Sequence, residues 1–279
     1  MKEFGVNYQL TDSVSYKEIN VYINEILAKP KMKKRLERFY QSYNDLKSIY
    51  LKKLSRDWRF NTFQWAQAIF NLTEKILFSY LRMKALSIAY KNVVSSGSHP
   101  NHTNPGISFY ADTTVINLNS LRDKLALMAW AYHHPFNPEK QEEVLDFNEI
   151  FNRLKKSESE TQGASLNHSD FLTILQAVHN GYSMFKHIAR YRHFKIHRLE
   201  PIIHMYGPQL HNTKLPYIRF DETNIQESID ISDKPINGLH VGYDEIEKVI
   251  ESSLEKIIDT SSELFTHIHN LPPYSNSMV

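Results

Sequence analysis

The sequence contains no cysteine and only 8 glycines among its 279 residues. The lack of cysteine excludes disulfides, thiolate metal sites and cysteine nucleophiles, and it is typical of a reducing compartment. So few glycines disfavour a turn-rich all-β fold or a glycine-loop nucleotide site, and they favour helices with short connections. The first ten residues, MKEFGVNYQL, lack an apolar run. We therefore expect no signal peptide and a cytoplasmic protein.

Long uninterrupted apolar runs are also missing. The most apolar stretch, residues 68–90, is broken by Glu74, Lys75, Arg82 and Lys84. This many charges predicts a buried helix rather than a membrane span, and we expect no membrane partner.

The net charge is only +2, but the charges are unevenly distributed along the chain. Residues 31–59 hold ten Lys or Arg and three acids, a net charge of +7. Residues 210–260 hold eleven acids and five Lys or Arg, a net charge of −6. A basic segment of this kind suits a phosphate backbone, although a solvated helix with spaced lysines is the more common reason for one.

Apolar residues at helical spacing extend over most of the chain. They predict helices at 15–28, 31–57, 61–94, 117–134, 144–156, 168–197 and 243–268. Polar residues, with glycine or proline, predict connections at 95–114 and 157–165, and residues 198–242 are predicted to be irregular, with short strands at 216–220 and 238–242. The predicted fold class is all-α, an antiparallel bundle of long helices with a partly irregular insert before the last helix.

A basic segment without any acid, ARYRHFKIHR, closes the helix predicted at 168–197. The apolar stripe of this helix steps by three or four residues through Phe171, Leu175, Val178, Tyr182, Phe185 and Ala189. Three more residues reach Arg192, so helical spacing puts this arginine on the buried stripe. An unpaired buried charge is unfavourable, which leaves three explanations. Arg192 pairs with a buried acid, extends to solvent at the helix end, or faces a cleft that receives a phosphate.

The two histidines after Arg192 raise the question of a metal site. His193 and His197 are four residues apart, as in helical metal-binding pairs. No acid accompanies them, and Lys195 with the nearby arginines would repel a divalent cation, so we expect no metal and no other cofactor. Arg190 lies seven residues before His197, almost above it on an ideal helix, whereas Arg192 lies roughly 140° around. A kink would bring Arg192 and His197 together, so both arginines stay candidates.

The order of Arg192, His193, three further residues and His197 resembles the Rx4–6H motif of the HEPN superfamily of helical bundles. Three features of the context agree with this resemblance. The motif ends a long amphipathic helix, the earlier segment NSLRDKLALMAWAYHH is similar to the other core helix of such bundles, and a further helix follows at 243–268. The resemblance implies a HEPN-like core over 115–269 with an insert at 198–242. Residues 1–94 add N-terminal helices within a single domain of residues 1–279.

The function that the resemblance implies is metal-independent endoribonuclease activity in a homodimer, with two motifs flanking one cleft. Such proteins include toxins and defence effectors, so RNA is the expected substrate, and an antitoxin or another protein is an expected partner. His197 would move a proton and Arg192 would stabilise charge on the phosphate. His193 would orient or assist, Arg190 is the alternative arginine, and Asp123 would position an arginine or histidine.

Two other functions fit the same residues. The chain could be a HEPN-like module that binds RNA, nucleotide or protein without cleaving anything. It could also be a structural helical protein in which Arg190 and Arg192 pair with the acidic region near the C-terminus. The structural interpretation expects carboxylates bound to these arginines, whereas the other two expect the arginines to face a cleft at a two-fold interface. Asp123 has a plain alternative as well, as a helix-surface acid paired with Arg122 or Lys124.

Overall fold

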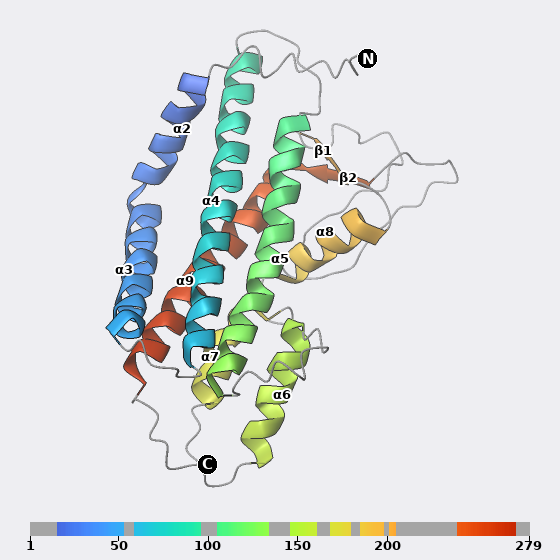
Figure 1. The fold of residues 1–279 in the computed structure, drawn as a ribbon. Helices are drawn as coiled ribbons and strands as arrows, with labels where there is room; N and C mark the ends of the chain where they lie inside the picture. The colour runs from blue at the N-terminus through green and yellow to red at the C-terminus, as the bar shows by residue number, and fades with distance from the viewer. Residues whose placement is uncertain are drawn as a thin grey trace, which may run out of the picture. The chain divides into compact units, whose positions relative to one another are not determined.

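The chain folds as an all-α bundle of long helices, as the sequence predicts (Figure 1). A computed structural model describes residues 16–52, 59–95, 105–133, 146–160, 168–179, 185–197, 201–204 and 239–271. The helices are α2 (Tyr16–Ala28), α3 (Pro30–Lys52), α4 (Arg59–Ser95), α5 (Pro105–His133), α6 (Phe147–Glu160), α7 (His168–Gln176), α8 (Phe185–His197) and α9 (Tyr243–Asn270). Two short strands, β1 (Pro201–His204) and β2 (Leu239–Gly242), accompany them.

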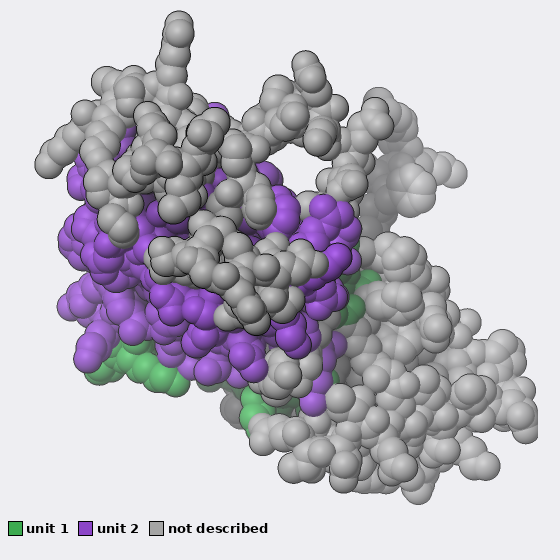
Figure 2. Space-filling view, turned by 90° about the horizontal axis from the view of Figure 1, so that it is seen from below, with its two compact units in different colours: residues 1–32, 76–116, 187–251 green, residues 33–75, 117–186, 252–279 purple. Residues whose placement is uncertain are grey.

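The chain divides into two compact units, each assembled from three separate segments (Figure 2). Unit 1 comprises Met1–Met32, Ile76–Ile116 and His187–Glu251. Unit 2 comprises Lys33–Lys75, Asn117–Lys186 and Ser252–Val279. Helices α3, α4, α5, α8 and α9 contribute residues to both units. The single domain over 1–279, with N-terminal helices at 1–94 and a core at 115–269, stays a prediction.

Proline and aspartate set several of the helix starts. Pro30 and Pro105 are the first residues of α3 and α5, the position at which the missing N–H of proline costs no hydrogen bond. Asp146 precedes α6, and its Oδ1 accepts a hydrogen bond of 2.8 Å from the backbone N–H of Glu149. This is the N-cap arrangement that satisfies one of the free donors in the first turn of a helix.

Helix α5 begins twelve residues before the predicted start at 117, so the connection predicted over 95–114 is wrong from residue 105 onward. The apolar stripe extends through this part of the helix, since Ile107, Ala111 and Val115 are buried at spacings of four. Thr113 and Thr114 donate their hydroxyl hydrogens to the carbonyls four residues earlier, which accommodates both polar side chains within the helix. The glycine, serine and threonine residues of this segment favoured a loop prediction, whereas the buried positions show that its apolar residues have helical spacing.

The helix predicted at 168–197 is also wrong, because the structure has two helices there, α7 and α8. Asn180 and Gly181 lie between them in the sequence, outside the described residues, and this dipeptide is a typical turn signal. Counting the apolar stripe across that dipeptide joined two separate helices into one. The polar connection predicted at 157–165 is likewise helical up to Glu160, within α6.

The insert before α9 contributes a pair of parallel strands. β1 pairs with β2 in the register Pro201↔Leu239 to His204↔Gly242. The strand predicted at 238–242 is confirmed, β1 was predicted to be irregular, and the strand predicted at 216–220 lies outside the described residues. Pro201 occupies the first position of its strand, where its lack of an N–H is tolerated.

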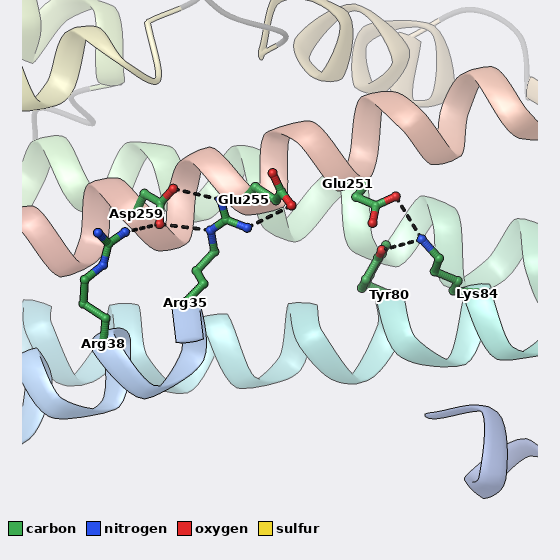
Figure 3. Close-up of polar contacts among 7 residues, drawn as sticks. All are labelled: Arg35, Arg38, Tyr80, Lys84, Glu251, Glu255 and Asp259. Atoms are coloured by element: carbon green, nitrogen blue, oxygen red, sulfur yellow. Dashed lines mark hydrogen bonds and ion pairs between the residues drawn. The ribbon is translucent and has the colours of Figure 1, made fainter. Parts of the chain in front are cut away.

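A polar cluster connects α4 to α9 in unit 1 (Figure 3). Lys84 Nζ donates to Glu251 at 2.9 Å and to the hydroxyl oxygen of Tyr80 at 3.1 Å, and lies 3.3 Å from Glu247. Burial and the neighbouring acids raise the pKa of Tyr80, so this phenol stays protonated. For Glu251, burial works in the opposite direction to the bonds from Lys84, and the bonds prevail, so its pKa is lowered. Lys84 from α4 therefore offsets part of the negative charge of Glu247 and Glu251 on α9.

A second cluster connects α3 to α9 in unit 2, and Figure 3 draws it as well. Arg35 donates to both carboxylate oxygens of Asp259 at 3.0 and 3.1 Å and lies 2.8 Å from Glu255. Arg38 also donates to Asp259. Burial alone would lower the pKa of Arg35, but the two acids outweigh it and raise that pKa. Arg35 and Arg38, two of the basic residues of this segment, thus bind acids of α9.

Candidate functional site

Helix α8 carries the predicted catalytic motif, and its residues from His187 onward belong to unit 1. Phe185, Ile188 and Tyr191, at steps of three residues, are buried. The Tyr191 hydroxyl donates a hydrogen bond of 2.8 Å to the Asp112 carboxylate on α5. α8 therefore meets α5 through a buried aromatic residue whose polar end has a partner.

Arg192 is exposed, although helical spacing puts it in line with the buried stripe. On a helix it lies about 40° from Ile188 and about 20° from Phe185, so it does share their face. Both of those side chains are fully buried. Helical spacing gave the correct position of Arg192 around the helix. The helix face that is buried at Ile188 is, however, exposed to solvent at Arg192, four residues later. The guanidinium of Arg192 can therefore meet something outside the described chain.

No described acid lies within ion-pair distance of Arg192. Five acids of α9 are engaged elsewhere: Glu255 and Asp259 with Arg35 and Arg38 in unit 2, and Asp244, Glu247 and Glu251 with Lys91 and Lys84 in unit 1. The explanation in which Arg192 pairs with a buried carboxylate thus finds no support among the described residues. Two explanations for the position of Arg192 remain, namely that it extends into solvent or that it faces a cleft that receives a phosphate.

The other predicted residues of the motif are placed by backbone alone. Helix α8 is α-helical throughout Phe185–His197, so no interruption of the helix separates Arg192 from His197 on the described backbone. Along a regular helix, Arg190 and His197 lie within about 20° of each other, and Arg192 and His197 are about 140° apart. The side chains of Arg190, His193 and His197 lie outside the described residues.

Asp123 has a structural partner in unit 2. Its Oδ1 accepts a hydrogen bond of 3.3 Å from the backbone N–H of Phe147 and lies 3.8 Å from a guanidinium nitrogen of Arg122. That guanidinium lies over the Phe147 ring, 4.9 Å from its centroid. The pairing with Arg122 predicted as the plain alternative is present, and Asp123 helps to hold the start of α6 against α5.

Two described histidines have lowered pKa values. Burial and the positive charge of Arg122 lower the pKa of His179, whose ring packs on Phe151 with centroids 4.7 Å apart. Burial lowers the pKa of His267 on α9, with the charge of Asp170 acting in the opposite direction. Neither residue belongs to the predicted motif, and both are neutral in a protein at neutral pH.

A surface pocket of about 430 Å³ lies in unit 2, lined by Arg38, Ile174, Ser262, Glu263, Thr266 and His267. Arg38 is already engaged with Asp259, and Glu263 contributes the opposite charge. The pocket therefore offers no net attraction for an anion such as a phosphate, and no predicted site residue lines it. We assign it no role in the candidate site.

An exposed row of aromatic side chains in unit 1 was missed from the sequence. We call Phe78 on α4 with Phe109 and Tyr110 on α5 the aromatic row. The Tyr110 ring joins the other two, with centroids 6.4 Å from Phe78 and 5.4 Å from Phe109. Phe78 is 56% exposed and Phe109 is 63% exposed. The repeat of Phe109 and Ile116 at seven residues would have revealed this face, had residues 105–114 been interpreted as helix.

Among the described residues no group of three His, Asp or Glu side chains is arranged to hold a metal ion. No helix of the described ranges is both long and apolar enough to cross a membrane. The chain matches no protein-family model, no curated protein and no solved structure.

Proposed function

We propose that the chain is a metal-independent endoribonuclease of the HEPN type, in which Arg192 and His197 act on one phosphate in a cleft between two copies. His193 would assist, and Arg190 is the alternative partner of His197. The toxin or defence role, a protein antitoxin and a cytoplasmic location stay predictions that follow from the resemblance.

The observation that carries the proposal is the exposure of Arg192 on a helix face that is buried one turn earlier. Long charged side chains at exposed positions are common, but this one lies in phase with Phe185 and Ile188, which are fully buried. A planar guanidinium with no described acid at ion-pair distance is well suited to bind a phosphate through two hydrogen bonds. An arginine with only a structural role would be expected to pair with a carboxylate in its own chain.

The geometry of a single helix supports a site shared between two copies. Arg192 and His197 are about 140° apart around α8 and about 7.5 Å apart along it. These separations favour a site in which Arg192 and His197 come from different copies of α8 rather than from the same one. A two-fold axis close to α8 would place Arg192 of one copy opposite His197 of the other and would create two equivalent sites.

The chemistry needs no metal because RNA carries its own nucleophile. The 2′-oxygen forms a bond to phosphorus while the bond from phosphorus to the 5′-oxygen breaks. A neutral His197 takes the 2′-hydroxyl proton, the imidazolium so formed passes a proton to the departing 5′-oxygen directly or through solvent, and Arg192 stabilises the charge that develops on the phosphate. The products are a 2′,3′-cyclic phosphate and a 5′-hydroxyl, and no water is consumed.

The test is cleavage of mixed RNA in EDTA by the purified chain, with Arg192→Ala, His197→Ala and Lys256→Ala beside it. Lys256 is an exposed cation on α9 and serves as the matched control. We expect the wild type and Lys256→Ala to cleave and to leave cyclic phosphate ends, and the other two variants to lose cleavage. Activity that requires added metal, or equal cleavage by all four proteins, contradicts the proposal. RNA binding without cleavage would identify a non-catalytic module instead.

A further inference from the structure

Part of the aromatic row lies on an exposed ridge of α5. Phe109, Thr113 and Ile116 recur at helical spacing, and Ile116 is 36% exposed. On the helical wheel Tyr110 lies about 100° to one side of Phe109, and Asp112 lies about 60° to the other side. The ridge is therefore bounded by α4 on the side of Tyr110 and by α8 on the side of Asp112.

A cation stands on each side of this ridge. The guanidinium carbon of Arg82 lies 5.3 Å from the centroid of the Phe78 ring, in cation–π geometry. On the other side, the bond from Tyr191 to Asp112 ties Arg192 of α8 to a position one turn beyond Phe109. All of these residues belong to unit 1. The exposed rings thus lie beside Arg82 on one side, and on the other side beside α8, the helix that carries the proposed phosphate-binding residue Arg192.

The size of the surface favours a small flat ligand over a protein. Phe78, Phe109 and Ile116 are 56%, 63% and 36% exposed. Together they leave roughly 300 Å² of side-chain surface open, given the area of aromatic side chains. A stable protein interface needs about 800 Å² from each partner. Unpaired bases stack on single aromatic rings, while phosphates are held by neighbouring arginines, so alternating rings and cations are typical of surfaces that bind single strands.

We infer that the aromatic row stacks unpaired bases of the RNA strand whose phosphate is bound by Arg192. This inference rests on the proposed ribonuclease function, and it adds a binding site and a preference for single-stranded over duplex RNA. In a duplex the bases stack on each other and their faces are not available to Phe78 and Phe109.

The experiment measures binding of a single-stranded 2′-O-methyl oligonucleotide, which cannot be cleaved because its nucleophile is blocked. The same oligonucleotide annealed to its complement is the duplex probe. Phe78→Ala and Phe109→Ala should each weaken single-strand binding roughly fivefold or more and leave duplex binding unchanged. Phe109→Trp should retain single-strand binding, because it keeps a ring for stacking. Val21→Ala, which removes a 48% exposed side chain on α2, is the matched control and should have no effect.

Three results would overturn the inference. The first is single-strand binding that is absent in the wild type or unchanged in both alanine variants. The second is an equal loss of single-strand and duplex binding. The third is a change of oligomeric state in the alanine variants without a change in strand affinity, which would make the row a protein contact. Cleavage of unmodified RNA by the same preparations tests the ribonuclease separately. Intact cleavage with unchanged binding defeats only the inference, and selective strand binding without cleavage defeats only the ribonuclease.

Discussion

Replacement of Arg35 by methionine should destabilise the fold far more than the same change two positions earlier. The Arg35 side chain is 12% exposed and binds Asp259 through two nitrogens and Glu255 through a third contact. The Lys33 side chain is 67% exposed and lies 4.0 Å from Glu37. Arginine, lysine and methionine have similar helix propensities, so the comparison isolates the ion pairs.

The expected losses of stability in the two variants follow from how deeply each ion pair is buried. Removal of one partner from a fully buried pair costs about 3–5 kcal/mol, whereas an exposed pair four residues apart on a helix contributes about 0.3–0.5 kcal/mol. Asp259 and Glu255 keep some contact with water, and Arg38 still binds Asp259, so we expect Arg35→Met to cost about 2–3 kcal/mol. Lys33→Met should cost no more than about 0.5 kcal/mol.

The assay is urea unfolding followed by the circular dichroism of the helices, with the free energy taken from the midpoint and slope. Asp259→Asn in the Arg35→Met background should recover part of the loss, because it removes a carboxylate that has lost its main partner. Equal stabilities of Arg35→Met and Lys33→Met, or a further loss in the double variant, would refute the assignment of this cluster.

Three further predictions concern single residues. His179→Phe should flatten the pH dependence of the free energy of unfolding. The pKa of His179 is lowered in the folded protein. Its contribution to stability is therefore complete above the ordinary histidine pKa of about 6.5 and is lost as the pH falls through the lowered pKa. Urea unfolding at several acidic pH values should show a wild-type decline that the variant lacks in part, and parallel declines would argue against this role. Asp123→Asn should retain cleavage and lose about 1 kcal/mol of stability, because the described contacts of Asp123 hold α6; loss of cleavage by a stable variant would return Asp123 to the catalytic site. Tyr191→Phe should cost about 0.5–1.5 kcal/mol, because it removes the hydrogen bond to Asp112, and unchanged thermal and urea stability would speak against that bond.

The long helices were predictable because their apolar stripes repeat many times. Helices α2, α4 and α9 were predicted to within two residues at each end by such stripes alone. The start of α5 was missed, since Thr113 and Thr114 are poor helix formers whose hydroxyls find carbonyl partners only once the helix exists. The polar composition of residues 105–114 favoured a loop prediction, although the apolar residues of a helix were already at helical spacing there.

Neither the burial of individual side chains nor their contacts with residues distant in the chain could be predicted from the sequence. Helical spacing gave the correct angle of Arg192 around α8, but angle does not reveal where a helix leaves the body that it packs on. The acids of α9 recur every four residues from Glu247 to Asp259, which indicates one face. Arg35, which binds the last two of these acids, is 224 residues away from Asp259 in the chain, and nothing local connects the two.

The most direct test of the proposed two-copy site is complementation between two inactive variants. Heterodimers of Arg192→Ala with His197→Ala, purified through two different tags, should regain about half of the wild-type cleavage in EDTA, because one of their two sites is then intact. Heterodimers of Arg192→Ala with the double variant Arg192→Ala, His197→Ala are the control and should stay inactive. Failure to recover a heterodimer, or a heterodimer as inactive as its parents, would contradict a site built from Arg192 of one copy and His197 of the other.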